Sequence, residues 1–169
     1  MIILEGIAMC FWLLIWCTVG ISNGAVGLVL LFEKDVQERV VELGLITEEK
    51  MKKNALIYSL ALFIPVLAGV PLTVYLINGA DSFMSGFLQM TAVFLIGNLF
   101  DRLFIDWYWV GHTKAWIIEG TENLQPYIPV KASVKKWIGT IIVFPMYAAL
   151  IAWVVELIRY SNFPHRNRL

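Results

Sequence analysis

The sequence predicts an all-α, polytopic membrane protein with four transmembrane helices and a cytoplasmic helical hairpin extension between the first two. Two observations predict this fold. Hydrophobic residues make up 59% of the 169 residues and charged residues 15%, whereas a soluble domain has roughly 45–50% and about 25%. In addition, Asp, Glu, Lys and Arg do not occur in 6–32, 54–80, 82–100 or 137–155. Each of these stretches approaches or exceeds the roughly 20 apolar residues that a helix needs to cross a bilayer.

Helix is the expected form of these stretches, because a backbone in lipid must satisfy its hydrogen bonds within the spanning structure. A transmembrane barrel would show segments of ~10 residues with alternating polarity, and the sequence does not alternate in this way. We therefore expect one integral membrane domain over 1–169, with spans at about 6–32, 55–77, 83–106 and 137–159.

The first stretch is expected to be a retained span rather than a signal peptide. It has no Lys or Arg before it, it is preceded by Glu5, and no small-x-small cleavage site follows near Ser22. Gly20, Gly24 and Gly27 have a spacing that permits close approach of a neighbouring helix. We interpret these glycines as packing positions within a span that continues to residue 32.

The second stretch contains Pro65, Gly69 and Pro71. Proline removes a backbone donor and kinks a helix, so a kinked span is expected here. The polar residues 78–82 then form a short turn, with Asp81 or Ser82 as the candidate N-cap of the next helix. The second and third spans are therefore expected to be antiparallel neighbours.

The connection after the first span predicts a second helix with one apolar stripe. Val36, Val40 and Leu43 follow one another at i, i+4 and i+7 among charged residues. Gly44 is expected to end this helix, and Thr47 to cap a new helix that continues into the second span. The two helices would form a hairpin that projects beyond the membrane.

Basic residues indicate the orientation of the chain. The 33–53 connection carries five Lys and Arg residues and the 107–136 connection carries four, whereas the 78–82 turn carries none. Because short loops rich in Lys and Arg remain cytoplasmic, we expect a cell-membrane protein with 33–53 and 107–136 in the cytoplasm. Within the second of these connections, the apolar trio Trp116-Ile117-Ile118 is expected to dip into the interface or to pack under the bundle.

A polar cluster at the end of the third span is the most informative feature for function. At 100° per residue, its members Asn98, Asp101, Arg102 and Asp106 occupy an arc of about 140°, and His112 lies one to two turns beyond. Arg102 and Asp106 are placed to pair at i and i+4. Such residues do not face lipid, so the arc should face the bundle interior or a wet cleft. It is either an interfacial ion-pair anchor or a cavity that binds an ion, a proton or an anionic group.

Other kinds of site are less well indicated. Asp101, Asp106, His112, Glu119 and Glu122 could supply metal ligands, but their spacing matches no metal-binding motif. We expect no metal and no cofactor, and the sequence identifies no catalytic residues. The high apolar and low charged fractions of the sequence exclude a basic nucleic-acid-binding domain.

Three functions are compatible with this pattern. The first is an ion- or solute-handling unit, or a subunit of a larger membrane assembly, with a polar cavity at the cytoplasmic end of the third span. The alternative is a membrane-embedded enzyme acting on a lipid or isoprenoid substrate at the cytoplasmic face. In such an enzyme, Arg102 or Lys114 would hold a phosphate. Asp101, Asp106 or His112 would then act as acid or base. A scaffold that docks through the hairpin is the third.

The lipid bilayer is the expected partner in each of these functions. A homo-oligomer or a partner membrane protein is also considered, since four helices enclose little volume.

Overall fold

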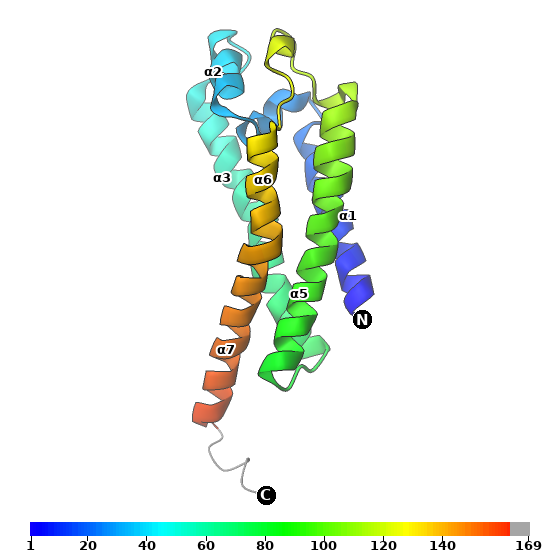
Figure 1. The fold of residues 1–169 in the computed structure, drawn as a ribbon. Coiled ribbons are helices and arrows are strands. Elements are labelled where there is room, and N and C mark those ends of the chain that lie inside the picture. Colours follow the sequence, from blue (N-terminus) through cyan, green and yellow to red (C-terminus); the bar gives the residue numbers. More distant parts are fainter. Residues whose placement is uncertain (163–169) are drawn as a thin grey trace, which may run out of the picture.

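A computed structural model describes residues 1–162, and all regular structure within them is helical. Four long helices run alternately up and down (Figure 1). The first is α1 (Ile2–Gly20), and the second begins as α3 (Glu48–Ile64) and continues to Ile77. The third consists of α5 (Phe83–Phe100) and η4 (Asp101–Val110), and the fourth of α6 (Val130–Ile138), η7 (Gly139–Val143) and α7 (Phe144–Asn162).

All four helices are long and apolar enough to cross a membrane. Many of their large apolar side chains point outward, among them Ile3, Leu60 and Ile141, which are half or more exposed. An apolar surface of this extent on several sides of a bundle is typical of a protein that lipid covers. The prediction of an all-α fold with four such helices is therefore confirmed.

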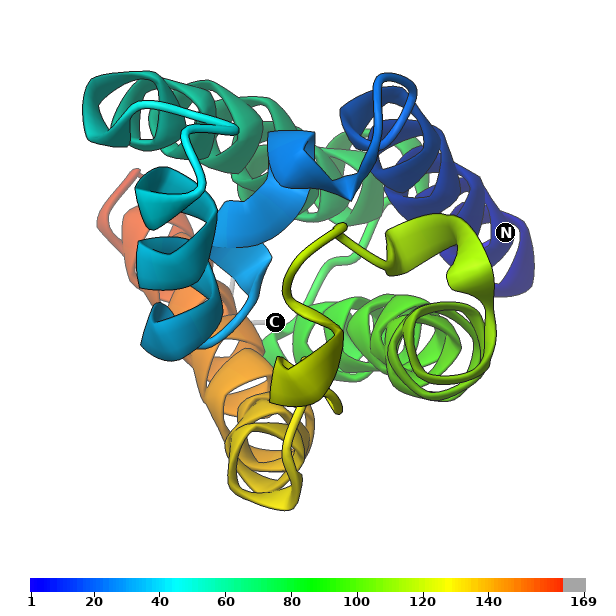
Figure 2. The same ribbon diagram turned by 90° about the horizontal axis from the view of Figure 1, so that it is seen from above.

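The prediction of one continuous helix over 6–32 is wrong beyond Gly20. There the chain turns through residues 21–24, and Gly24 adopts a φ of 93°, a conformation that glycine reaches without steric cost. The short helix η1 (Ala25–Leu31) then crosses the top of the bundle (Figure 2). Gly20 and Gly27 thus allow η1 to fold back closely onto the end of α1, instead of packing against a neighbouring long helix.

The second helix is distorted where its prolines predict, yet it remains continuous. Its backbone widens to an i→i+5 pattern in η2 (Pro65–Gly69) and η3 (Thr73–Ile77), on either side of α4 (Val70–Leu72). The hydroxyl of Thr73 donates to the carbonyl of Gly69 at 2.9 Å. The carbonyl that Pro71 leaves without its N–H donor is that of Leu67, and it accepts from the hydroxyl of Tyr147 at 2.6 Å.

The third helix is the centre of the bundle. It packs most extensively against α1 and α7, whereas it meets the second helix mainly around α4 and η3. The side chains of Met90, Val93 and Phe94 are buried in these interfaces. Gly97 brings α1 close, because a Cβ at this position would lie 2.6 Å from the sulfur of Met9.

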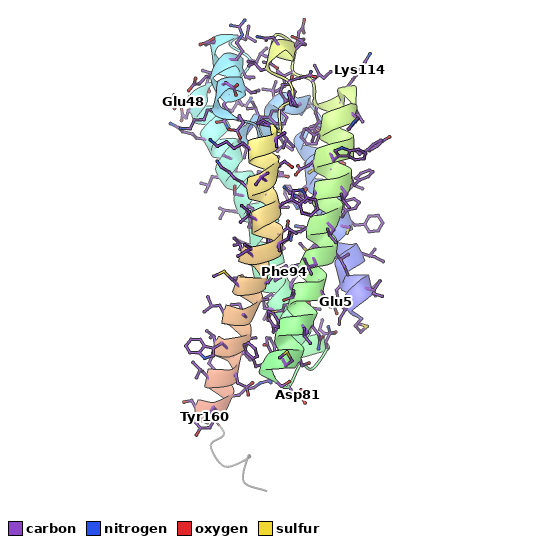
Figure 3. The ribbon with its side chains drawn as sticks, in the orientation of Figure 1. Glu5, Glu48, Asp81, Phe94, Lys114 and Tyr160 are labelled. Atoms are coloured by element: carbon purple, nitrogen blue, oxygen red, sulfur yellow. The ribbon has the colours of Figure 1, made fainter. Side chains whose placement is uncertain are left out.

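The two longer connections lie at the same end of the bundle, where Figure 3 labels Glu48 and Lys114, and Asp81 marks the opposite end. The first contains α2 (Lys34–Glu42), and the second contains two short 3₁₀ turns, η5 (Lys114–Trp116) and η6 (Glu122–Leu124). Thr47 caps α3 as predicted, since its hydroxyl accepts from the backbone N–H of Lys50 at 3.3 Å.

These two connections pack together into a cap over the bundle. Val36 and Val40 of the predicted stripe are buried, whereas Leu43 is partly exposed. The ring of Phe32 stacks on that of Tyr127 with centroids 4.7 Å apart, and Trp116 packs edge-on against Phe32 at 6.2 Å. Arg39 of the first connection also donates to the carbonyl of Gly120 in the second at 3.4 Å, so the two connections are in direct contact.

We predict that Trp116→Ala destabilises the protein by about 3–5 kcal/mol, because a large buried ring leaves a cavity when it is removed. The indole is 1% exposed. The measurement is the free energy of unfolding in detergent micelles. Ile117→Ala, at the partly exposed neighbour, is the matched control and should cost clearly less. Equal losses in the two variants would show that the cap is not packed as described.

Candidate functional site

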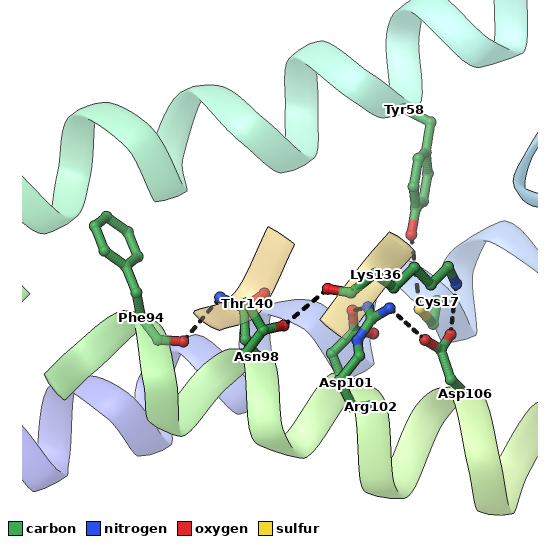
Figure 4. A network of polar contacts seen from close by, with 9 residues as sticks. All are labelled: Cys17, Tyr58, Phe94, Asn98, Asp101, Arg102, Asp106, Lys136 and Thr140. Atoms are coloured by element: carbon green, nitrogen blue, oxygen red, sulfur yellow. Dashed lines mark hydrogen bonds and ion pairs between the residues drawn. The ribbon is translucent and has the colours of Figure 1, made fainter. Parts of the chain in front are cut away.

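Four charged side chains meet inside the bundle below the cap (Figure 4). Asp101, Arg102 and Asp106 project from η4, and Lys136 projects from α6. The guanidinium of Arg102 forms ion pairs with Asp101 and with Asp106, whose Oδ2 lies 2.6 Å from Nη1. The ammonium of Lys136 donates to Oδ1 of Asp106 at 2.8 Å. We call these four residues the charged tetrad.

The backbone of η4 explains how two carboxylates reach one arginine. In an α-helix, residues five apart are turned away from each other, and Asp101 falls at the margin of the predicted polar arc. The i→i+5 pattern of η4 makes each turn wider, so Asp101 and Asp106 come onto the same face. Arg102 then lies beside both of them. Widened turns of this kind occur frequently at functional sites.

The tetrad is largely withdrawn from solvent and its formal charges cancel. The exposed fractions of the side chains are 9% for Arg102, 14% for Asp106, 24% for Asp101 and 32% for Lys136. Removing charges from water is costly unless each is paired and hydrogen-bonded. Two cations beside two carboxylates offset that cost, and the Lys136–Asp106 contact also joins the fourth helix to the third.

Two of the predicted site residues do not join the tetrad. Asn98 is buried one turn earlier, but its amide donates to the carbonyl of Phe94 at 2.8 Å within the same helix. His112 is exposed beyond the end of η4, with Nδ1 2.6 Å from the carbonyl oxygen of Trp107. The structure therefore brings Asp101, Arg102 and Asp106 together and leaves Asn98 and His112 beside them.

Sequence reasoning missed Lys136, which it counted among the cytoplasmic basic residues. Lys136 directly precedes the charge-free stretch 137–155, and this position could have indicated a charge that faces inward. It also missed Cys17 and Tyr58, whose sulfur and hydroxyl lie 3.6 Å apart beside the tetrad. Residues of these types without a motif carry no signal in a single sequence.

Two cavities meet at the tetrad. An outer cleft of about 570 Å³ lies between η4, α6 and the segment 111–129, and His112 is on its wall. An inner chamber of about 330 Å³ lies between α1, α3, η4 and α6, and is lined mainly by apolar side chains. Asp101 and Lys136 face the chamber. Both cavities are lined by Arg102, Asp106, Val110 and Ile128.

The described residues contain no group of three or more His, Cys, Asp or Glu side chains placed to hold a metal ion. The carboxylates of the tetrad are paired with the side chains of Arg102 and Lys136. The arrangement is suited to an exchange of charge partners, in which a polar group entering either cavity replaces a contact within the tetrad.

Comparison with protein-family models, with curated proteins and with solved structures finds no match to this chain.

We predict that Arg102→Met destabilises the protein by about 3–5 kcal/mol, because it leaves buried carboxylates uncompensated. The double variant Arg102→Met/Asp106→Asn restores neutrality and should recover part of this loss. Thermal or chemical unfolding in detergent provides the measurement. In the exposed Lys52–Glu48 pair, Lys52→Met should change stability by less than about 1 kcal/mol. A double variant less stable than Arg102→Met would contradict the assigned pairing.

Proposed function

We propose that this chain is an integral membrane protein that handles a small ion or solute, and that the charged tetrad controls passage between the outer cleft and the inner chamber. The observation that carries the proposal is the position of the tetrad: Arg102 and Asp106 line both cavities at once. A solute moving between the cleft and the chamber would pass these two side chains.

The size and lining of the chamber support this function. Ligand sites are typically cavities of roughly 300–1,000 Å³ with mostly apolar walls and a few polar groups that fix orientation. The chamber, at about 330 Å³, has apolar walls and the tetrad at one side. Within residues 1–162, Nε of Arg102 is buried and has no hydrogen-bond partner, so a donor is available to a solute with an acceptor group.

Charged residues inside a membrane bundle also support a role in transport. Such residues are costly to maintain and commonly mark ion or substrate pathways. In the proposed orientation, the connections 33–53 and 107–136 are cytoplasmic, because they carry most of the Lys and Arg residues outside the spans. The outer cleft, which the segment 111–129 borders, would then open toward the cytoplasm.

The geometry favours this function over an enzyme acting on a lipid or isoprenoid. The guanidinium of Arg102 lies between two carboxylates, and their negative charge disfavours an anionic phosphate at this position more than a cation or a neutral solute. Lys114 and His112 are not among the described residues that line the chamber. Arg102, Asp101 and Asp106 do line the chamber, but both carboxylates are already paired with cations, and this pairing disfavours their use as proton donors.

We predict that thiol labelling of Cys17 reports passage through the tetrad. Cys17 lines the chamber, and Cys10→Ser removes the other cysteine of the sequence. A permanently charged methanethiosulfonate, which does not dissolve in lipid, should modify Cys17 slowly by way of the cleft. Ser133→Trp, which fills the cleft, should slow the reaction severalfold. Asp106→Asn should accelerate it, because it loosens the contacts of both cations.

Val134→Trp is the matched control, since Val134 neighbours Ser133 and points outward with 52% of its surface exposed. It should leave the labelling rate unchanged. The proposal fails if Cys17 is labelled at the same rate in all four proteins, because the reagent would then reach the chamber by a route that avoids the tetrad.

A further inference from the structure

A second polar site lies toward the opposite end of the bundle, on the side where Figure 3 labels Glu5 and Asp81. It borders a groove of about 390 Å³ between α1 and the distorted part of the second helix. The groove walls are mainly apolar, with Val70 and Val93 among them, and Glu5 supplies the one carboxylate among the described residues that line it. The groove remains open next to Gly69, where an added Cβ would meet no described atom within 4 Å.

A chain of amide hydrogen bonds holds Glu5, the residue that lines the groove at its polar end. The amide nitrogen of Gln89 donates to the hydroxyl of Ser85 at 3.0 Å, so its oxygen is the acceptor that faces Asn78. The amide nitrogen of Asn78 donates to this oxygen at 3.0 Å and to Oε2 of Glu5 at 3.1 Å. Both N–H groups of Asn78 are thereby used, and its Oδ1 remains as an acceptor.

One acceptor oxygen is consequently left over on Glu5, which lines the groove, and another on Asn78, which is bonded to Glu5. Within residues 1–162, Oε1 of Glu5 and Oδ1 of Asn78 are both buried and have no hydrogen-bond partner. Arg159 of α7 is engaged elsewhere, since it donates to the carbonyl of Ala80 at 2.7 Å and lies over the ring of Tyr75. A buried carboxylate oxygen without a donor is costly, so the site is complementary to a cation that donates hydrogen bonds.

We propose that the groove binds a primary ammonium group carried on an apolar body. The ammonium would donate to Oε1 of Glu5, and the apolar body would lie along the groove beside Val70 and Val93. This chemistry excludes a quaternary ammonium, which has no N–H to donate. An inorganic cation fits less well, because such ions require more oxygen ligands than this end of the groove supplies.

An ammonium of this kind has two sources, a free amine and the headgroup of an aminophospholipid such as phosphatidylethanolamine. The proposal concerns the chemistry that both share. It is independent of the role of the tetrad, since the groove is lined by neither Ser133 nor any tetrad residue among those described.

The test is binding of tritiated 2-phenylethylamine to the purified full chain in phosphatidylcholine nanodiscs, with empty nanodiscs subtracted. We expect saturable binding. Unlabelled 2-phenylethylamine should displace the bound radioligand, whereas the neutral isostere 2-phenylethanol should not. Glu5→Gln should weaken binding about tenfold or more, the effect of losing one charged hydrogen bond. Glu156→Gln, at an exposed carboxylate of α7, should leave it unchanged.

A steric variant keeps the test informative if Glu5→Gln does not fold. Gly69→Leu places a side chain in the groove where a Cβ is tolerated and should weaken binding to a similar degree. Ala68 neighbours Gly69 in the sequence but lies outside the groove, so Ala68→Leu should leave binding unchanged. Ser133→Trp in the outer cleft should also leave binding unchanged.

Addition of phosphatidylethanolamine to the nanodiscs distinguishes the two sources. Displacement of the labelled amine would identify the lipid headgroup as the occupant, and undiminished binding would identify a free amine. The proposal is overturned if 2-phenylethylamine does not bind saturably to the folded wild-type chain, or if Glu5→Gln and Gly69→Leu both bind it as wild type does.

Discussion

Two carboxylates inside the helix bundle must be paired with cations. The structure of the half of the molecule that carries the two long connections depends on this constraint. Asp101 and Asp106 need cations, and only one of these comes from their own helix. The other, Lys136, comes from the fourth helix, so α6 must approach η4 closely enough for a 2.8 Å contact. The chain after Val110 covers this end of the bundle, where Trp116 and Tyr127 pack on Phe32.

The three cavities follow one another through the molecule. The outer cleft and the inner chamber share Arg102 and Asp106, and the chamber and the groove share Met9 and Val66. Val66 lies in the widened turn that follows Pro65. The two walls between cavities thus contain a charged tetrad and a proline-distorted segment, and in both the helix backbone is widened.

Much of the fold could be predicted from the sequence. Charged side chains are costly in lipid, so four long stretches without them indicate four helices that are long and apolar enough to cross a membrane. The reversal at Gly24 could not be predicted, since glycines in apolar segments serve both close packing and turns, and only the tertiary structure decides between them. The docked cap was missed for a related reason. The stripe of Val36 and Val40 shows that α2 buries one face, but not which surface covers it.

The site was predicted in part. Asp101, Arg102 and Asp106 were identified because charged residues beside an apolar span are exceptional. Lys136 was not, because a lysine just outside a span is ordinary, and its pairing with Asp106 joins positions 30 residues apart. In the sequence, Glu5 indicates only that the first stretch is not a signal peptide. The groove beside Glu5 could not be predicted, because its walls include Gly69 and Val93 of other helices.

A double-mutant cycle between Asp106 and Lys136 tests most directly whether the buried charges organise this end of the bundle. The four proteins are wild type, Asp106→Asn, Lys136→Met and the double variant, and the quantity measured is the free energy of unfolding in detergent. We expect a favourable coupling energy of about 1–3 kcal/mol between the two side chains, as for residues within one ion-pair network. A coupling energy of zero would contradict the assignment of Lys136 to the tetrad.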